Sequence, residues 1–499
     1  MSGTGIQLGF VSGSFPDAPG RLHLVGVDGV EELSRLFEFQ LLLTSPDGPL
    51  IDAELAALVC DPCAVALGPG SSDVVHGLLA DIEHLDGTRY REQRYVARFV
   101  PYVSLLAMAP RSAVYQNVTV PELVDQLLTS YGLVRCEHFE FIESRTMKSP
   151  KREYIVQYQE SDWDFLCRWL EHEGYFYWFH HTRDAAVLMI AHANEDTSTI
   201  EAPWQLEFRE RNNLATGGAV TVWDFNVVQR RITSRVIAME YNHRSPNDVL
   251  VAVQDVDAKG FGNVFSFGEH FKDLAAGRDI ARLRAERFRA TQRTVRGVAD
   301  CARLRVGHRF ALQNHHVASY DGDYLVTKIR HRVGYDVAAT RSPERADADA
   351  PLRPYNAEFE ALPAGVQYRP ERRTRWPRIH GYLPAHVEAD TGGDYAQIDG
   401  EGRYKVKLPF DAGTLKGLAA SRWVRMAQAY AGAGYGTHYP LHKGTEVLLA
   451  HVDGDPDRPV ILAAVPNRLT PGPVVAGNAT QSVLDTASSI RVELEDLQS

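Results

Sequence analysis

Three aspartates at alternating positions are the strongest candidate for metal chemistry in the chain. Asp453, Asp455 and Asp457 have the spacing that opens an EF-hand calcium loop. Such a loop also needs glycine at its sixth position and glutamate at its twelfth, where this sequence has Arg458 and Ala464. The calcium hypothesis therefore fails. Proline and glycine beside the aspartates instead predict a tight turn between two strands, in which Arg458 bonds a nearby carboxylate.

Two other motifs begin like catalytic or cofactor sites and are not completed. The glycine-rich segment 431–437 has Thr437 where a nucleotide loop needs its third glycine, and no helix pattern follows it. His172 and Glu173 begin a zinc-protease motif, but Phe176 occupies the position of the second histidine. The sequence also has no nucleophile elbow of the G-x-S-x-G type. We therefore predict no catalytic, cofactor-binding or metal-binding residues, and no enzyme.

The cysteines do not form a recognisable redox or disulfide framework. Cys60 and Cys63 form a CxxC pair, but we find neither a βαβ context nor a second pair of ligands. Five cysteines in 499 residues is an odd number and a low density. We expect reduced thiols.

Five arginines form the strongest basic patch: Arg369, Arg372, Arg373, Arg375 and Arg378. A nucleic-acid site would be expected to have several aromatic partners and a net basic domain, and here the aromatic residues are few. The whole chain carries 53 basic against 64 acidic residues, a formal net charge of −11. We therefore predict no nucleic-acid partner, and interpret the patch as a connector that grips acidic surface on neighbouring chains.

Most of the sequence is typical of short β-strands, and a few helices are well marked. Runs rich in Val, Ile, Tyr and Phe alternate with Gly, Asp, Asn and Pro. Capping residues and apolar stripes predict helices over about 119–132, 161–174 and 273–294. Short strands over about a hundred residues, beginning with the alternating segment 403–408, fit a small barrel of the OB type.

The last strand of the chain is amphipathic. Ile490, Val492 and Leu494 alternate with charged residues, which gives one apolar face. We see nothing in the same chain to complete a sheet with it, so we expect it to pair with other copies of the protein.

The sequence shows neither an N-terminal signal peptide nor a membrane-spanning helix. The first residues lack a basic segment followed by an apolar run, and no stretch approaches the roughly 18 apolar residues of a membrane helix. We expect synthesis in the cytoplasm and export, where it occurs, without a signal peptide.

Several stretches resemble VgrG proteins, the spikes of bacterial type VI secretion systems, and are similar to the hub and spike proteins of contractile phage tails. They follow one another in the expected order: 152–179, 269–290, 322–333 and 355–381. The sharpest single motif is the turn formed by Gly454, Asp455, Pro456, Asp457, Arg458 and Pro459. The last stretch, NATQSVLDTASSIRVELED, resembles the entry into the β-helical needle of the family.

The resemblance implies a mainly β protein with a few helices. It implies a tail-hub-like region over 1–365 with two β-barrel units and helical insertions, a connector over 366–380, and an OB-fold barrel over 381–470. Residues 471–499 are expected to be the truncated start of a trimeric β-helical needle, because relatives continue much further. The two barrel units are not visible as a sequence repeat.

The function that the resemblance implies is the structural spike of a contractile injection apparatus. It would be a homotrimer that caps a tube of hexameric Hcp-like rings, contacts baseplate components and carries a PAAR-type tip and effectors on its needle. After assembly in the cytoplasm it would be injected across a target membrane. The alternatives are the spike of an extracellular contractile particle or phage tail and, with less support, a cell-wall hydrolase carried on a tail spike.

Overall fold

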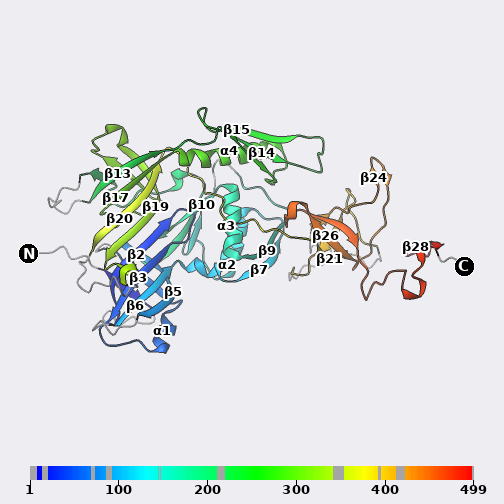
Figure 1. Ribbon diagram of the computed structural model, residues 1–499, viewed down its shortest axis with the longest axis horizontal. Coiled ribbons are helices and arrows are strands. Elements are labelled where there is room, and N and C mark those ends of the chain that lie inside the picture. The colour runs from blue at the N-terminus through cyan, green and yellow to red at the C-terminus, as the bar shows by residue number, and fades with distance from the viewer. Residues whose placement is uncertain are drawn as a thin grey trace, which may run out of the picture. The chain divides into compact units, whose positions relative to one another are not determined.

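The computed structural model describes ten stretches of the chain, which divide into two compact units (Figure 1). The described residues are 8–13, 21–68, 73–85, 93–143, 145, 148–210, 220–340, 353–390, 395–411 and 422–496. The first unit contains residues 1–108, 120–149 and 163–374, and the second contains 109–119, 150–162 and 375–499. The architecture is mainly β with a few helices, which confirms the predicted fold class.

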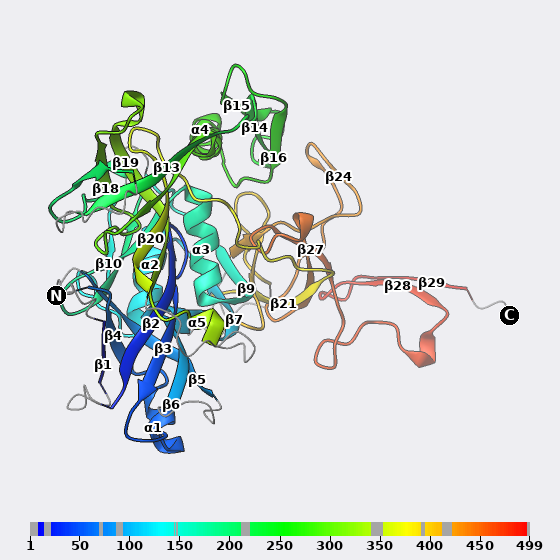
Figure 2. The ribbon, with the colours of Figure 1, turned by 60° about the vertical axis from the view of Figure 1, so that its left-hand side comes forward.

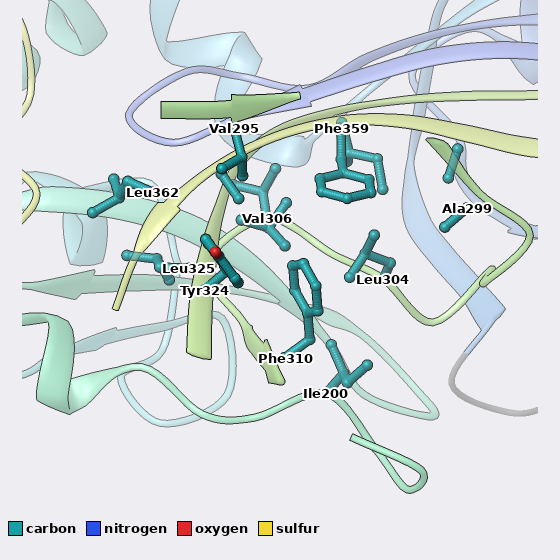
Figure 3. Close-up of a cluster of buried hydrophobic side chains, with 14 of the residues drawn as sticks. Ile200, Val295, Ala299, Leu304, Val306, Phe310, Tyr324, Leu325, Phe359 and Leu362 are labelled. Carbon is teal, nitrogen blue, oxygen red and sulfur yellow. The ribbon is translucent and has the colours of Figure 1, made fainter. Parts of the chain in front are cut away.

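A closed six-stranded barrel forms one part of the first unit. Its strands are β12 (Gln205–Phe208), β13 (Thr221–Gln229), β17 (Arg293–Ala299), β18 (Arg309–Gln313), β19 (Gly322–Gly334) and β20 (Arg353–Pro363). They pair in the cyclic order β12-β13-β17-β20-β19-β18, and β12 is parallel to both of its neighbours. Figure 3 shows the interior, where Phe310, Tyr324 and Phe359 pack with smaller aliphatic side chains. This interior leaves no room for a channel at the depth of these rings.

A half-barrel continues the same sheet through β19. Its strands are β1 (Gly9–Ser12), β2 (His23–Glu32), β3 (Glu38–Ser45), β4 (Pro62–Ala66), β5 (Val74–Leu85) and β6 (Gln93–Val100), with the short helix α1 (Asp52–Leu58) between β3 and β4. The sheet order is β1-β4-β5-β6-β3-β2, with β2 next to β19. In the described residues the half-barrel ends at β1, which has no second strand partner.

The two barrels share one strand order. When their strands are numbered along the chain, both follow 2-3-6-5-4-1. The irregularities coincide as well, because the bulge between Leu79 and Asp81 on β5 has its counterpart between Val326 and Lys328 on β19. Bulges are positioned features of a sheet, so a shared bulge and a shared order indicate two versions of one structural unit.

Helices and small sheets cover the rest of the first unit. Its helices are α2 (Val120–Ser130), α3 (Asp162–Glu173), α4 (Leu274–Gln292) and α5 (Val337–Thr340), and the first three confirm the predicted helices. One small sheet has the order β10-β11-β8, from Phe176–His181, Ala186–Ala191 and Phe139–Phe141. Another has the order β15-β14-β16, from Leu250–Asp255, Arg235–Glu240 and Asn263–Phe267. Figure 2 shows α4 beside this second sheet.

The second unit is built on a five-stranded sheet of order β23-β22-β21-β26-β27. These strands are Arg422–Val424, Tyr404–Lys407, Leu383–Glu388, Glu446–His451 and Pro459–Ala464. A two-stranded ribbon from much earlier in the sequence, β7 (Pro110–Tyr115) with β9 (Ile155–Ser161), belongs to the same unit. Tyr154 and Val156 of this ribbon segment lie in the hydrophobic core with residues of β21, β22 and β26. The ribbon therefore supplies part of the core of the second unit.

Two hairpins complete the second unit. They are β24 (Ala431–Gly432) with β25 (Tyr435–Gly436), and β28 (Gln481–Asp485) with β29 (Arg491–Glu495). Among the described residues, no helix has the length and apolar character that crossing a bilayer requires.

Candidate functional site: the aspartate turn, the connector and the last hairpin

The aspartate turn, residues 453–459, joins β26 to β27. Asp453 has φ of 55° and Gly454 has φ of 70°, so the chain reverses through two successive left-handed residues. Glycine takes this conformation freely and aspartate takes it more readily than most other residues. The two left-handed residues explain the predicted turn. The reversal brings Asp455 and Asp457 against the interior of the second unit, where both are buried.

Asp457 holds the ribbon. Its side chain is almost completely buried, and its Oδ1 accepts a hydrogen bond of 2.6 Å from the backbone N–H of Val156. Arg422 donates to the carbonyl of Asp457 and lies 5.6 Å from the ring centroid of Tyr154. A carboxylate that accepts a buried backbone N–H makes a charge-assisted bond, which is stronger than a neutral one. Asp457 thus fixes the position of β9 in this unit.

Asp455 organises the turn itself. Its Oδ1 accepts from the N–H of Asp457 at 3.0 Å and from the indole Nε1 of Trp376 at 3.4 Å. The Nε of Arg458 lies 3.4 Å from Oδ2 of Asp455, so the arginine has the nearby carboxylate partner that the sequence predicted. At the surface, Arg378 pairs with Asp453 at 2.6 Å. Each aspartate thus has an arginine or backbone partner, which is a structural role.

The connector arginines in the first unit bind acidic residues of their own chain. Arg369 is buried and its Nε donates to Glu286 at 2.7 Å. Arg372 donates to Glu269 at 2.7 Å, and Glu269 also accepts from buried Arg284 at 2.9 Å. Despite burial, the two guanidinium groups lower the pKa of Glu269 to about 2, so the carboxylate is charged. The fold thus gives both arginines carboxylate partners within their own chain, and a contact of this patch with neighbouring chains stays a prediction.

Glu171 fixes the middle of the connector to helix α3. Its Oε2 accepts from the backbone N–H groups of Arg373 and Thr374 at 3.0 and 3.1 Å, and its Oε1 accepts from the Thr374 hydroxyl at 2.8 Å. Burial raises the pKa of Glu171, while these three donors oppose that shift. The residues 366–374 are therefore held in place by side chains of the first unit, not loosely attached to it.

The last hairpin corrects one expectation from the sequence. The strand with Ile490, Val492 and Leu494 is not without a partner in its own chain, since β29 pairs antiparallel with β28. The sequence between them turns at 486–489, which returns the chain to its own previous strand. All three predicted residues are more than half exposed, at 66%, 54% and 63%. Leu484 lies opposite Val492, so the exposed apolar residues share one face of the hairpin.

The ribbon is the functional element that the sequence did not reveal. The alternation of Tyr154, Val156 and Tyr158 indicates a strand, and that signal was available. The pairing of Val156 with Asp457, 301 residues further along the chain, could not be predicted. Periodicity carries no information about which distant residue accepts a hydrogen bond. The cysteines behave as expected: all five are free, and burial raises the pKa of Cys63 to about 12.

Comparison with known proteins identifies the family. The model of the family described as phage tail baseplate hub (GPD) matches residues 30–337, more than half of the chain. Residues 395–465 match the type VI secretion system/phage-baseplate injector OB domain. The fold and the two matches define the class: a protein of the phage tail baseplate hub type with an injector OB domain. The chain belongs to the phage tail baseplate hub family.

The curated relatives include a spike protein and a toxin. The type VI secretion system spike protein VgrG1c of Pseudomonas aeruginosa is 28% identical over 95% of this chain and 64% of its own length. The actin cross-linking toxin VgrG1 of Vibrio cholerae is 27% identical over 83% of this chain and 37% of its own length. The chain thus spans less than two thirds of the curated relatives described here.

A solved structure confirms the fold. The E. coli c3393 protein is a type VI secretion component with structural similarity to T4 phage tail proteins gp27 and gp5. It superimposes with a TM-score of 0.65 at 24% identity and covers 91% of this chain and 99% of its own.

Proposed function

We propose that this chain is the hub and collar of a trimeric spike in a type VI secretion apparatus. The observation that carries the proposal is the pair of barrels with one strand order and one shared bulge, in a chain that belongs to the baseplate hub family. Three chains with two such barrels each present six similar faces. A ring of six identical tube subunits can dock on that arrangement with near-equivalent contacts.

The trimer would continue through the last hairpin. Its exposed face carries Ile490, Val492 and Leu494, while the other face carries the ion pair of Arg491 with Asp485 at 3.2 Å. Three such hairpins can bury their apolar faces against one another around an axis and leave the charged faces in water. We propose these three residues as the self-pairing surface and Gly454–Pro459 as the turn that braces the barrel above it.

The partners and route follow from the same role. The hub would bind an Hcp-like hexameric ring and baseplate components, and a needle below the collar would carry a PAAR-type tip and effectors. The spike would leave the cytoplasm by injection rather than through a signal peptide. We propose a structural role without catalysis for the described residues, because 465–480 between β27 and β28 forms only a short connection. A phage tail or extracellular particle is the alternative setting, favoured only by the family description itself.

The test combines mass and tube binding. Light scattering of the purified chain should give three times the 55.6 kDa chain mass. Electron microscopy after mixing with purified hexameric tube rings should show rings stacked coaxially on one end of the particle. Val492→Asp should weaken the trimer, whereas Glu493→Gln on the opposite face of the hairpin should not. A folded trimer that does not bind the tube rings would refute the tube-capping role.

A further inference from the structure

The outer face of the β14–β16 sheet is apolar and uncovered in the single chain. The inner face, with Val236, Ala238 and Ala252, packs on α4. The outer face presents the alternate residues, which the strand register brings side by side: Ile237 with Phe265, Met239 with Phe267, and Val253 next to Ile237. The sheet therefore has a helix layer on one side and no layer on the other.

The outer face exposes two phenylalanine rings of one strand beside other apolar side chains. Phe265 is 65% exposed, Phe267 is 62% exposed and Val253 is 49% exposed. At about 200 Å² for each phenylalanine side chain, the two rings alone expose about 250 Å². Contiguous apolar patches of a few hundred Å² on soluble proteins are often functional. A stable interface needs about 800 Å² from each partner, so the two rings would supply about a third of the contribution of this chain.

The chemistry of the face selects an apolar partner. Its charged residues, Arg235 and Asp255, stand opposite each other at one end and bond to each other at 2.8 Å. The strands carry no further charge on this side. An acidic or basic ligand would therefore find nothing to pair with, whereas a complementary apolar surface would gain from burial along most of the face.

We propose that this face, formed by Ile237, Met239, Val253, Phe265 and Phe267, packs against a second copy of the chain in the trimeric hub. The inference rests on the proposed trimer. A permanent neighbour fits the face better than a passing cargo, because an apolar sheet face left open while the spike waits for cargo would promote aggregation. The contact is head-to-tail: the face of one copy meets a different surface of the next, as a closed ring of three requires.

A paired variant tests the contact. Phe265→Ser with Phe267→Ser should raise the protein concentration for half-assembly at least about tenfold in light scattering, as expected for central aromatic anchors. Circular dichroism and the melting of the hub should stay unchanged, since both side chains are largely exposed in the single chain. Met108→Ser is the matched control, because Met108 is 74% exposed and does not belong to this sheet, so the variant should leave assembly unchanged.

Thiol labelling separates this inference from the trimer itself. In a background with exposed Cys60 and Cys136 replaced by serine, the thiol introduced by Phe265→Cys should react slowly with maleimide in the trimer. The thiol introduced by Gln126→Cys, on the exposed side of α2, should react fast in every state. A trimer in which both react equally fast would overturn the sheet contact and leave the proposed function standing. A chain that is monomeric at every concentration would overturn both.

Discussion

The bond between Asp457 and the Val156 amide gives the sharpest test of how the second unit holds together. Asp457→Ala would remove the acceptor and leave a buried N–H without a partner. A hydrogen bond to a charged group contributes about 1.5–3 kcal/mol, and an abandoned buried donor costs about 1–3 kcal/mol. We therefore expect the free energy of unfolding of this unit to fall by about 2–3 kcal/mol.

Asp453→Asn is the matched control in the same turn, because asparagine also tolerates the left-handed conformation of this position. Asp453 pairs with Arg378 at 2.6 Å, but its side chain is 74% exposed. Exposed ion pairs contribute about 0–1 kcal/mol, so this variant should be close to the parent. Each variant removes one carboxylate from this turn: Asp457 bonds the Val156 amide, whereas Asp453 bonds only an exposed arginine.

The assay is thermal melting combined with hydrogen exchange of the ribbon. At roughly 2–4 °C for each kcal/mol, Asp457→Ala should lower the melting temperature of the second unit by about 4–12 °C. Amides of residues 154–158 should lose protection, because β9 is held in part through Val156. If Asp457→Ala and Asp453→Asn have the same melting temperature and the ribbon keeps its protection, the proposed role of Asp457 is wrong.

Three further predictions concern the turn, the connector and the buried histidines. Arg458→Ala should cost about 1 kcal/mol in urea unfolding, because it removes the cationic partner of largely buried Asp455, and an unchanged midpoint would reduce Arg458 to a surface residue. Glu171→Ala should speed tryptic cleavage within 366–374 several-fold, since the connector loses three hydrogen bonds, and cleavage at the parental rate would contradict that role. Burial lowers the pKa of His192 to about 3 and of His308 to about 4. Below pH 6.5 these two histidines are therefore protonated in the unfolded chain before they are protonated in the folded one. The free energy of unfolding should fall by up to about 1.4 kcal/mol per pH unit for each histidine. Equal urea midpoints at pH 7 and pH 5 would refute this prediction.

Local chemistry made several elements predictable. The helix over 274–292 begins where Asp273 caps it, with its Oδ1 accepting from the N–H of Ala276 at 2.9 Å. The alternation around 404–407 gave a strand, and Asp453 with Gly454 gave a turn. Each of these depends on residues within one turn or one strand of each other, which is the range over which a sequence pattern acts.

The relation between the two barrels needed the tertiary structure. Counted from the shared bulge, Leu41 opposite Ala97 in the half-barrel corresponds to Gly297 opposite Phe359 in the closed one. A cross-strand pair can be filled from either side, so the large and small residues have exchanged places while the space stays filled. The likeness therefore survives in strand order and register and is invisible as a sequence repeat.

The sequence by itself determined the family, the strands and helices, and the turn with its aspartates. Only the tertiary structure decided which partners the charged groups have: Glu286 for Arg369 and Val156 for Asp457. The physical reason is the range of the interactions. Capping, turns and periodicity act between neighbours along the chain, whereas a buried charge finds its partner through the fold that removes both from water.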